Sequence, residues 1–220
     1  DKALSQLILF KELGAACMAY GETSGTIQNV QSASLNTKRK ISDDDFKTYG
    51  KKLTLFAEFC SDFGMPISFH HHMGTAVETE HELDLLMNNT GEAVHLLFDT
   101  GHMTFAGGNS INVINKYAKR ISHVHTKDIR SPIVKSLDKD KESFLDAVLK
   151  GAFTVPGDGT IDFKEVIESL AKNNYEGWFI VEAEQDPAKA NPLEMAKIGN
   201  KELRDCLSNS GYDIEEYKDE

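Results

Sequence analysis

Apolar residues along the chain alternate between helical spacing and short unbroken runs. After Ser42 they recur at intervals of three and four as far as Phe59, which predicts an amphipathic helix that Ser42 caps and that ends near Gly64. Short unbroken runs are typical of strands buried on both faces. Five runs are predicted to be strands: Ala15–Tyr20, Pro66–His70, Val94–Asp99, Ile121–His125 and Trp178–Glu182.

Helical spacing follows each predicted strand and also precedes the first one, where it marks one face with Leu4, Leu7, Ile8 and Leu13. Further helices are predicted around residues 78–87, 111–117, 142–149, 163–170 and 192–207. This order predicts a parallel α/β fold. It does not separate an open doubly wound sheet from a closed barrel. No GxGxxG or GxxxxGK[ST] motif follows the first strand, so a nucleotide-binding open sheet has no support.

The composition limits the class of protein. With 220 residues, 40% of them hydrophobic, we expect one domain over 1–208 and a loosely held acidic tail over 209–220. No apolar run reaches the roughly 18 residues of a membrane span and no leader precedes the first helix, so we expect a soluble, cytoplasmic protein. The three separated cysteines indicate neither a disulfide framework nor a thiolate metal site. The formal net charge of −11 argues against a nucleic-acid partner.

Metal-binding side chains stand at the C-terminal ends of four predicted strands: the run His70–His72, Asp99, His125 and Glu182. In a barrel, the C-terminal strand ends converge on one mouth, so these side chains would meet. In an open sheet they would be spread along an edge. Mixed imidazole and carboxylate ligands suit Mn²⁺, Co²⁺, Fe²⁺ or Zn²⁺ better than Ca²⁺. The sequence therefore predicts a barrel with a divalent-metal site at its mouth.

Each of these side chains also has a simpler interpretation. Asp99 could cap the turn after its strand, and a single histidine is more often a hydrogen-bonded core residue than a ligand. Glu182 could be a solvated loop carboxylate, although Glu184 and Asp186 suit that role better. The coincidence at four strand ends favours a shared metal site over four separate explanations.

Strand alternation limits which histidines at the strand ends can be metal ligands. It places His70 and His72 on one face and directs His71 away from it. His123 and His125 are expected to stand at different heights on their strand, so at most one of them is a ligand.

Five motifs around these positions resemble the xylose isomerase-like family of metal barrels, and most closely its inosose dehydratases. They are His70–Thr75, Phe98–His102, His123–Asp128, Phe153–Gly159 and Val181–Pro187. The Asp-Thr-Gly-His and His-x-His patterns occur throughout the superfamily. The triple histidine before Met-Gly-Thr and the Glu-Ala-Glu-Gln-Asp-Pro run are much more specific. The resemblance extends from about residue 14 to about residue 203.

The resemblance implies metal ligands at the ends of the fifth to eighth barrel strands, where the superfamily usually has Glu, Asp, His and Glu. The last three positions fall on Asp99, His125 and Glu182. The first falls on the triple-histidine run, which has no glutamate. His70 is our choice for that ligand, with His72 in reserve and Glu78 as a weaker candidate.

The same mapping makes Ala15–Tyr20 the fourth strand of an eight-stranded (β/α)₈ TIM barrel. Three strands, about 80 residues at the usual length of a β/α unit, are then expected before residue 1. The chain also begins with Asp1, without a methionine, inside a helical pattern. We therefore expect this sequence to lack the first three strands of a longer protein.

The resemblance implies loss of water from scyllo-inosose (2-keto-myo-inositol) to a trihydroxycyclohexane-1,2-dione, through a metal-stabilised enediolate. Proton transfer is assigned to Glu182 and to a member of the histidine run, His70 first. Lys127 or His102 would assist the departing hydroxyl, and the superfamily also uses the His102 position to touch substrate. The implied cofactor is Mn²⁺ or Co²⁺, with glutathione as a helpful additive. The implied partner is a small polyhydroxy ketone, and a homo-oligomer is left open.

Other interpretations share parts of this evidence. A sugar epimerase or isomerase with the same barrel would form the enediolate but return a proton, and the triple histidine in place of a catalytic glutamate favours the lyase. A metal-dependent endonuclease would need more histidine ligands and a basic face, which the charge of −11 disfavours. A truncated chain could also have no activity. We interpret Pro156–Gly159 as a turn and regard Lys189 and Asn191 as weak candidates for the mouth.

Overall fold

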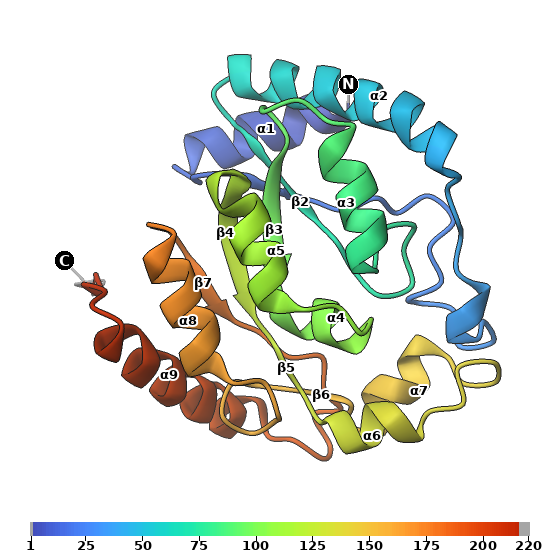
Figure 1. The fold of residues 1–220 in the computed structure, drawn as a ribbon, viewed down its shortest axis with the longest axis vertical. Helices are drawn as coiled ribbons and strands as arrows, with labels where there is room; N and C mark the ends of the chain where they lie inside the picture. Colours follow the sequence, from blue (N-terminus) through green and yellow to red (C-terminus); the bar gives the residue numbers. More distant parts are fainter. Residues whose placement is uncertain (1, 216–220) are drawn as a thin grey trace.

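Strands and helices alternate in the computed structural model, which describes residues 2–215 (Figure 1). The strands are β1 (Met18–Tyr20), β2 (Ile67–His70), β3 (His95–Asp99), β4 (Ile121–Thr126), β5 (Asp128–Ile129), β6 (Phe153–Thr154) and β7 (Phe179–Val181). The helices are α1 (Lys2–Glu12), α2 (Asp43–Asp62), α3 (Glu80–Asn88), α4 (Thr100–Phe105), α5 (Ser110–Tyr117), α6 (Ser131–Ser136), α7 (Phe144–Leu149), α8 (Phe163–Lys172) and α9 (Pro192–Asn209), with 3₁₀ turns at Leu35–Thr37 and Ala118–Arg120.

The order of the strands identifies the type of sheet. Five strands pair in parallel in the order β1-β2-β3-β4-β7, which is also their order along the chain. A doubly wound sheet reverses its strand order at a switch point, whereas a (β/α) barrel keeps the chain order from strand to strand. The described residues therefore form an arc of a barrel with β1 and β7 at its edges. The predicted fold class is confirmed.

The main core fills the space between this sheet and its flanking helices. Leu96 and Phe98 of β3 are fully buried, as are Phe46 of α2, Ile114 of α5 and Ile167 of α8. Figure 1 shows these helices on the outside of the strands. Because the apolar stripe of each helix faces the sheet, the core fixes the strand positions and hence the positions of the strand ends.

A second, smaller core lies beyond the sheet, where α6, α7, β5 and β6 gather (Figure 1). It contains Phe105, Phe144 and Phe153, all nearly inaccessible to solvent. The long β1–α2 loop joins it through Leu35, whose N–H donates to the Glu142 carbonyl at 2.9 Å. The antiparallel pair β5–β6, α4 and α6 were not predicted from the sequence. They are too short to show a helical or strand period.

The two longest helices are amphipathic and capped. Ser42 accepts the Asp45 N–H at the start of α2, as predicted, and Asn191 caps α9 by accepting from Leu193 and Glu194. None of the helices in residues 2–215 combines the length and apolarity needed to cross a membrane.

The structure adds detail at both chain ends and shortens the first predicted strand. Only Leu7 of the α1 stripe is buried, while the other three apolar residues of that stripe face solvent. The first strand is shorter than Ala15–Tyr20, and Ala19 is exposed because the described residues cover only the face that carries Met18. The tail expected over 209–220 shares Asn209 with α9, and its Tyr212 packs its ring 5.3 Å from that of Phe179, while its looseness stays a prediction. Residues 216–220 lie outside the described residues.

The close packing of α2 on the end of α3 gives a stability prediction. A Cβ on Gly50 would lie 2.1 Å from the Asn89 carbonyl oxygen, which is backbone and cannot move aside easily. Gly50→Ala should gain about 1 kcal/mol of helix propensity and lose about 3 kcal/mol to overpacking, so we expect a net loss of about 2 kcal/mol in the free energy of unfolding. Urea denaturation measures this. Gly21→Ala, where an added Cβ meets nothing within 4 Å, is the control and should change stability little. Equal stability of the two variants would contradict the close contact between the helices.

Candidate metal centre

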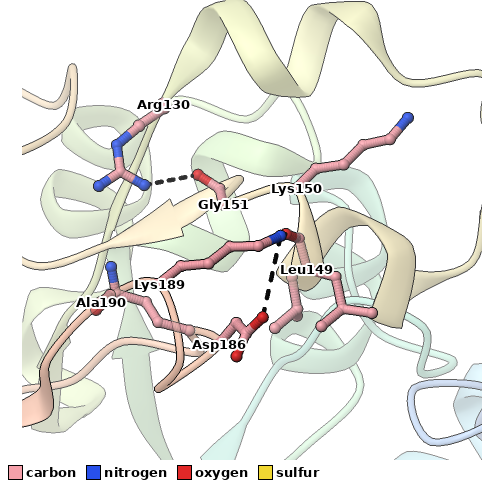
Figure 2. Close-up of a pocket in the computed structure, with 9 residues that line it drawn as sticks. Arg130, Leu149, Lys150, Gly151, Asp186, Lys189 and Ala190 are labelled. Atoms are coloured by element: carbon pink, nitrogen blue, oxygen red, sulfur yellow. Dashed lines mark hydrogen bonds and ion pairs between the residues drawn. The ribbon is translucent and has the colours of Figure 1, made fainter.

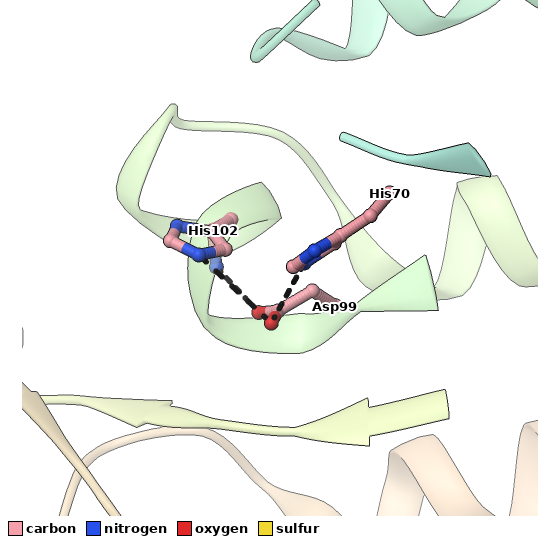
Figure 3. Close-up of side chains that lie close together, drawn as sticks. All are labelled: His70, Asp99 and His102. Atoms are coloured by element: carbon pink, nitrogen blue, oxygen red, sulfur yellow. Dashed lines mark hydrogen bonds and ion pairs between the residues drawn. The ribbon is translucent and has the colours of Figure 1, made fainter. Parts of the chain in front are cut away.

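Four side chains from four strand ends face one another at one end of the sheet. His70 is the last residue of β2, Asp99 is the last of β3, and His125 lies opposite Asp99 in β4. Glu182 follows directly after β7. Figure 3 shows His70 approaching the Asp99 carboxylate from one side while His102 approaches it from the other. The sequence-based prediction placed these residues at one mouth, and the structure brings them together.

Four buried polar atoms at this point have no hydrogen-bond partner among the described residues: His70 Nε2, Asp99 Oδ2, His125 Nδ1 and Glu182 Oε2. Asp99 Oδ2 lies 3.5 Å from His70 Nε2 and 3.5 Å from His125 Nδ1. Glu182 Oε2 lies 3.0 Å from His125 Nδ1. A polar atom left unpaired in the interior costs about 1–3 kcal/mol, so four together call for a shared partner.

A divalent metal ion fits Asp99, His125 and Glu182, and His70 borders this group through Asp99. Imidazole nitrogens and carboxylate oxygens bind Zn²⁺ and similar ions at about 2.0–2.2 Å, which holds neighbouring ligand atoms about 3.0–3.5 Å apart. The observed separations of 3.0–3.5 Å match that range. The ligand atoms of Asp99, His125 and Glu182 all lie within 4.8 Å of one another.

The two oxygens of Asp99 serve different purposes. Oδ1 accepts the His102 N–H at 2.9 Å and caps α4, while Oδ2 faces the cluster. The simpler interpretation of Asp99 as a cap is therefore also correct, for one oxygen. Burial alone would raise the pKa of this carboxyl, but the Lys127 ammonium and the neighbouring histidines hold the pKa well below its usual value. Asp99 is thus an anion in a fully buried position.

The histidines of β4 are not equivalent. Burial alone would lower the pKa of His125, but Asp99 and Glu182 raise it to about 9, so a metal has to displace a proton there. His123 stands one step lower on the strand, with Nδ1 4.0 Å from Cys17 Sγ, and burial lowers its pKa to about 4. Of these two rings, His125 is the one in reach of Asp99.

A second group of metal-binding side chains adjoins the first. His72 Nε2 lies 3.3 Å from Glu184 Oε1, and His102 Nε2 lies 3.6 Å from Glu184 Oε2. Lys127 Nζ lies between the two groups, 2.8 Å from Glu184 Oε2 and 3.2 Å from Glu182 Oε2. The site therefore has two lobes that share a lysine.

Comparison with known proteins identifies the family. The sequence profile of the xylose isomerase-like TIM barrel family matches residues 2–206. The chain belongs to this family. Its members share the barrel whose C-terminal strand ends form the mouth described above.

Curated relatives in the family are substantially longer than this chain. The rhizopine catabolism protein MocC of Rhizobium meliloti is 44% identical over 212 residues, which cover 96% of this chain and 65% of the relative. An inosose dehydratase of Clostridium beijerinckii is 45% identical over 196 residues, which cover 88% of this chain and 66% of the relative. The chain thus spans about two thirds of these relatives' length.

Solved structures of the family share the fold at low sequence identity. A crystal structure of an IOLI protein with a zinc atom superimposes with a TM-score of 0.67 at 19% identity, covering 94% of this chain and 68% of that one. A D-tagatose 3-epimerase-like protein gives a TM-score of 0.63 at 19% identity, covering 93% and 67%. Such low identity supports the fold alone.

Within this member of the family, Lys127 and His102 are fully buried. Burial would lower the pKa of the Lys127 ammonium, but Asp99, Glu184 and Glu182 raise it above its usual value. Burial and that ammonium keep the pKa of His102 well below its usual value, so the ring is neutral. The lysine reaches this position because Gly101 leaves room for its stem. A Cβ there would lie 2.6 Å from Lys127 Cγ.

Glu184 is the site residue that sequence reasoning missed, since it was expected to be a solvated loop carboxylate. The available signal was its position two residues after Glu182, which suggests a common side of an extended segment. Asp186 does behave as a loop carboxylate, accepting the Ala188 N–H at 3.0 Å.

The three weaker candidates for the site, Glu78, Lys189 and Asn191, make their contacts away from the metal-binding side chains. Glu78 accepts the Gly74 N–H at 2.8 Å and stabilises its own loop. Lys189 donates to the Leu149 carbonyl at 2.6 Å and lines the pocket drawn in Figure 2, whose lining residues include none of the metal-binding side chains. Asn191 caps α9. The sequence makes Lys189 and Asn191 weak candidates for the mouth, and the structure places both outside it.

His71, which points away from its neighbours, holds Asp99 in place. Its Nε2 accepts the backbone N–H of Asp99 at 3.1 Å, which continues the link between β2 and β3 beyond their last paired residues. Burial lowers the pKa of His71 to about 3, so the ring is neutral and keeps the lone pair that this bond requires.

Loss of this hydrogen bond should loosen the Asp99 carboxylate. We expect His71→Leu to weaken Mn²⁺ binding about tenfold, the lower end of the effect of removing a group that orients a ligand. His71→Gln is the matched control, because its amide oxygen can accept the same N–H, and it should retain most of the affinity. Isothermal titration with Mn²⁺ measures both. Equal loss in the two variants would mean that ring packing, not this bond, supports Asp99.

Proposed function

We propose that this chain carries the metal site of a hydro-lyase that removes water from scyllo-inosose to give a trihydroxycyclohexane-1,2-dione. The observation that carries the proposal is the set of four buried polar atoms at the strand ends that make no hydrogen bond among the described residues. The inosose dehydratase relative at 45% identity supports the choice of substrate. A small, uncharged polyhydroxy ketone also suits a chain with a formal net charge of −11.

The proposed ligands are His70 Nε2, Asp99 Oδ2, His125 Nδ1 and Glu182 Oε2. When bound there, Mn²⁺ or Co²⁺ would supply Lewis-acid stabilisation for the enediolate of the ketone. His70 is preferred to His72 because His70 Nε2 faces Asp99 at 3.5 Å, whereas His72 Nε2 faces Glu184.

Proton transfer is assigned to side chains that a substrate can reach. Glu182 has a third of its side chain exposed and is proposed to remove the proton next to the ketone. His72, with 15% exposed, is proposed to protonate the departing β-hydroxyl, which leaves as water. Lys127 and His102 are fully buried, so we assign them to positioning Glu182 and Glu184 rather than to contact with substrate.

An absorbance assay tests the reaction. Metal-free protein mixed with scyllo-inosose in D₂O should give the absorbance of the enolised diketone only after Mn²⁺ is added, with glutathione varied separately. The epimerase alternative predicts no absorbance, but solvent deuterium at the carbon next to the ketone, which proton NMR detects. Folded, Mn²⁺-loaded protein that includes the three strands expected before residue 1 and gives neither signal would rule out both reactions.

The role of Glu182 gives a second test. Glu182→Gln keeps the size of the side chain but cannot accept the proton, so kcat should fall about 100- to 10,000-fold. Glu58→Gln on the exposed face of α2 is the control and should leave kcat unchanged. Near-normal turnover by the Glu182 variant would remove it from the mechanism.

A further inference from the structure

The group formed by His72, His102 and Glu184 has the composition and spacing of a metal site in its own right. Their ligand atoms all lie within 4.8 Å of one another. The closest approaches to the Glu184 carboxylate are 3.3 Å from His72 and 3.6 Å from His102. These values lie near the roughly 3.0–3.5 Å expected between ligands of one divalent ion.

A cation from the protein already lies at this group. Lys127 Nζ is 2.8 Å from His102 Nε2 and 2.8 Å from Glu184 Oε2. An ammonium has three N–H donors and no acceptor, so it needs lone pairs around it, as a metal does. The Lys127 side chain is fully buried, so its ammonium contacts the carboxylates of the site and not solvent.

The two rings direct their Nε2 atoms to the same carboxylate. His72 Nδ1 lies 2.7 Å from the Met73 carbonyl oxygen, which can only accept, so Nδ1 carries a hydrogen and Nε2 is the atom that faces Glu184 Oε1 at 3.3 Å. His102 Nε2 accepts from the Lys127 ammonium. Each ring therefore presents Nε2 to the Glu184 carboxylate, which Lys127 Nζ also contacts.

We propose that Lys127 acts as a tethered cation in a second cation site formed by His72, His102 and Glu184, and so limits the protein to one divalent metal. The proposal rests on the proposed function, in which His70, Asp99, His125 and Glu182 hold that single ion. With the lysine removed, a second ion could bind about 3.5–4 Å from the first, the usual spacing of two-metal sites.

The test compares the Mn²⁺ stoichiometry of the native protein with that of Lys127→Ala by equilibrium dialysis. We expect one Mn²⁺ per native chain and two per variant chain, with the electron paramagnetic resonance spectrum of a spin-coupled pair. Lys127→Met removes the charge but keeps the bulk, so it should bind one. The double variant with Lys127→Ala and Glu184→Ala should also return to one. A folded Lys127→Ala protein that binds one Mn²⁺ would overturn the proposal.

A second variant tests the same idea with Lys127 in place. Because His72 faces Glu184 and not the ligands of the native metal, His72→Ala should keep one Mn²⁺, with affinity changed less than about tenfold. Loss of that ion would place His72 in the native site and overturn the proposal. Native protein that binds no Mn²⁺ would instead overturn the proposed metal site itself, so the two failures are distinguishable.

Discussion

The negative charge of the buried Asp99 carboxylate is the constraint on which the site depends. No part of this side chain reaches solvent, and an uncompensated charge in that position would destabilise the fold by several kcal/mol. Several groups around Asp99 stabilise this charge. One oxygen caps α4, the other faces His70, His125 and Lys127, and His71 holds its backbone. The neighbouring elements are therefore positioned by their relation to one anion.

The metal-binding strand ends were predictable because strand geometry and barrel topology act together. A strand directs alternate side chains to one face, and sequential parallel strands bring their C-terminal ends to one mouth. These two rules place His70, Asp99, His125 and Glu182 together without knowledge of any loop. In the structure the five strands pair in their order along the chain, as the barrel topology requires.

The second lobe was not predictable in the same way, because it depends on segments without a period. Glu184 lies beyond the end of β7, and its spacing of two from Glu182 suggests a common side without indicating which groups it contacts. The rings of His72 and His102 pack against Phe144 and Phe153, which belong to the small core beyond the sheet. Which carboxylate the buried lysine would pair with could be decided only by the packing of these pieces.

The absence of a side chain at Gly101 has a consequence for how this site can change over time. A methyl group there would occupy the path of the Lys127 stem, with 2.6 Å between Cβ and Cγ. A larger residue at 101 is thus compatible only with a smaller one at 127, while a smaller residue at 127 places no demand on 101. Substitutions at the two positions have a preferred order. A lineage that leaves this arrangement would first lose the lysine and only then fill the space beside it.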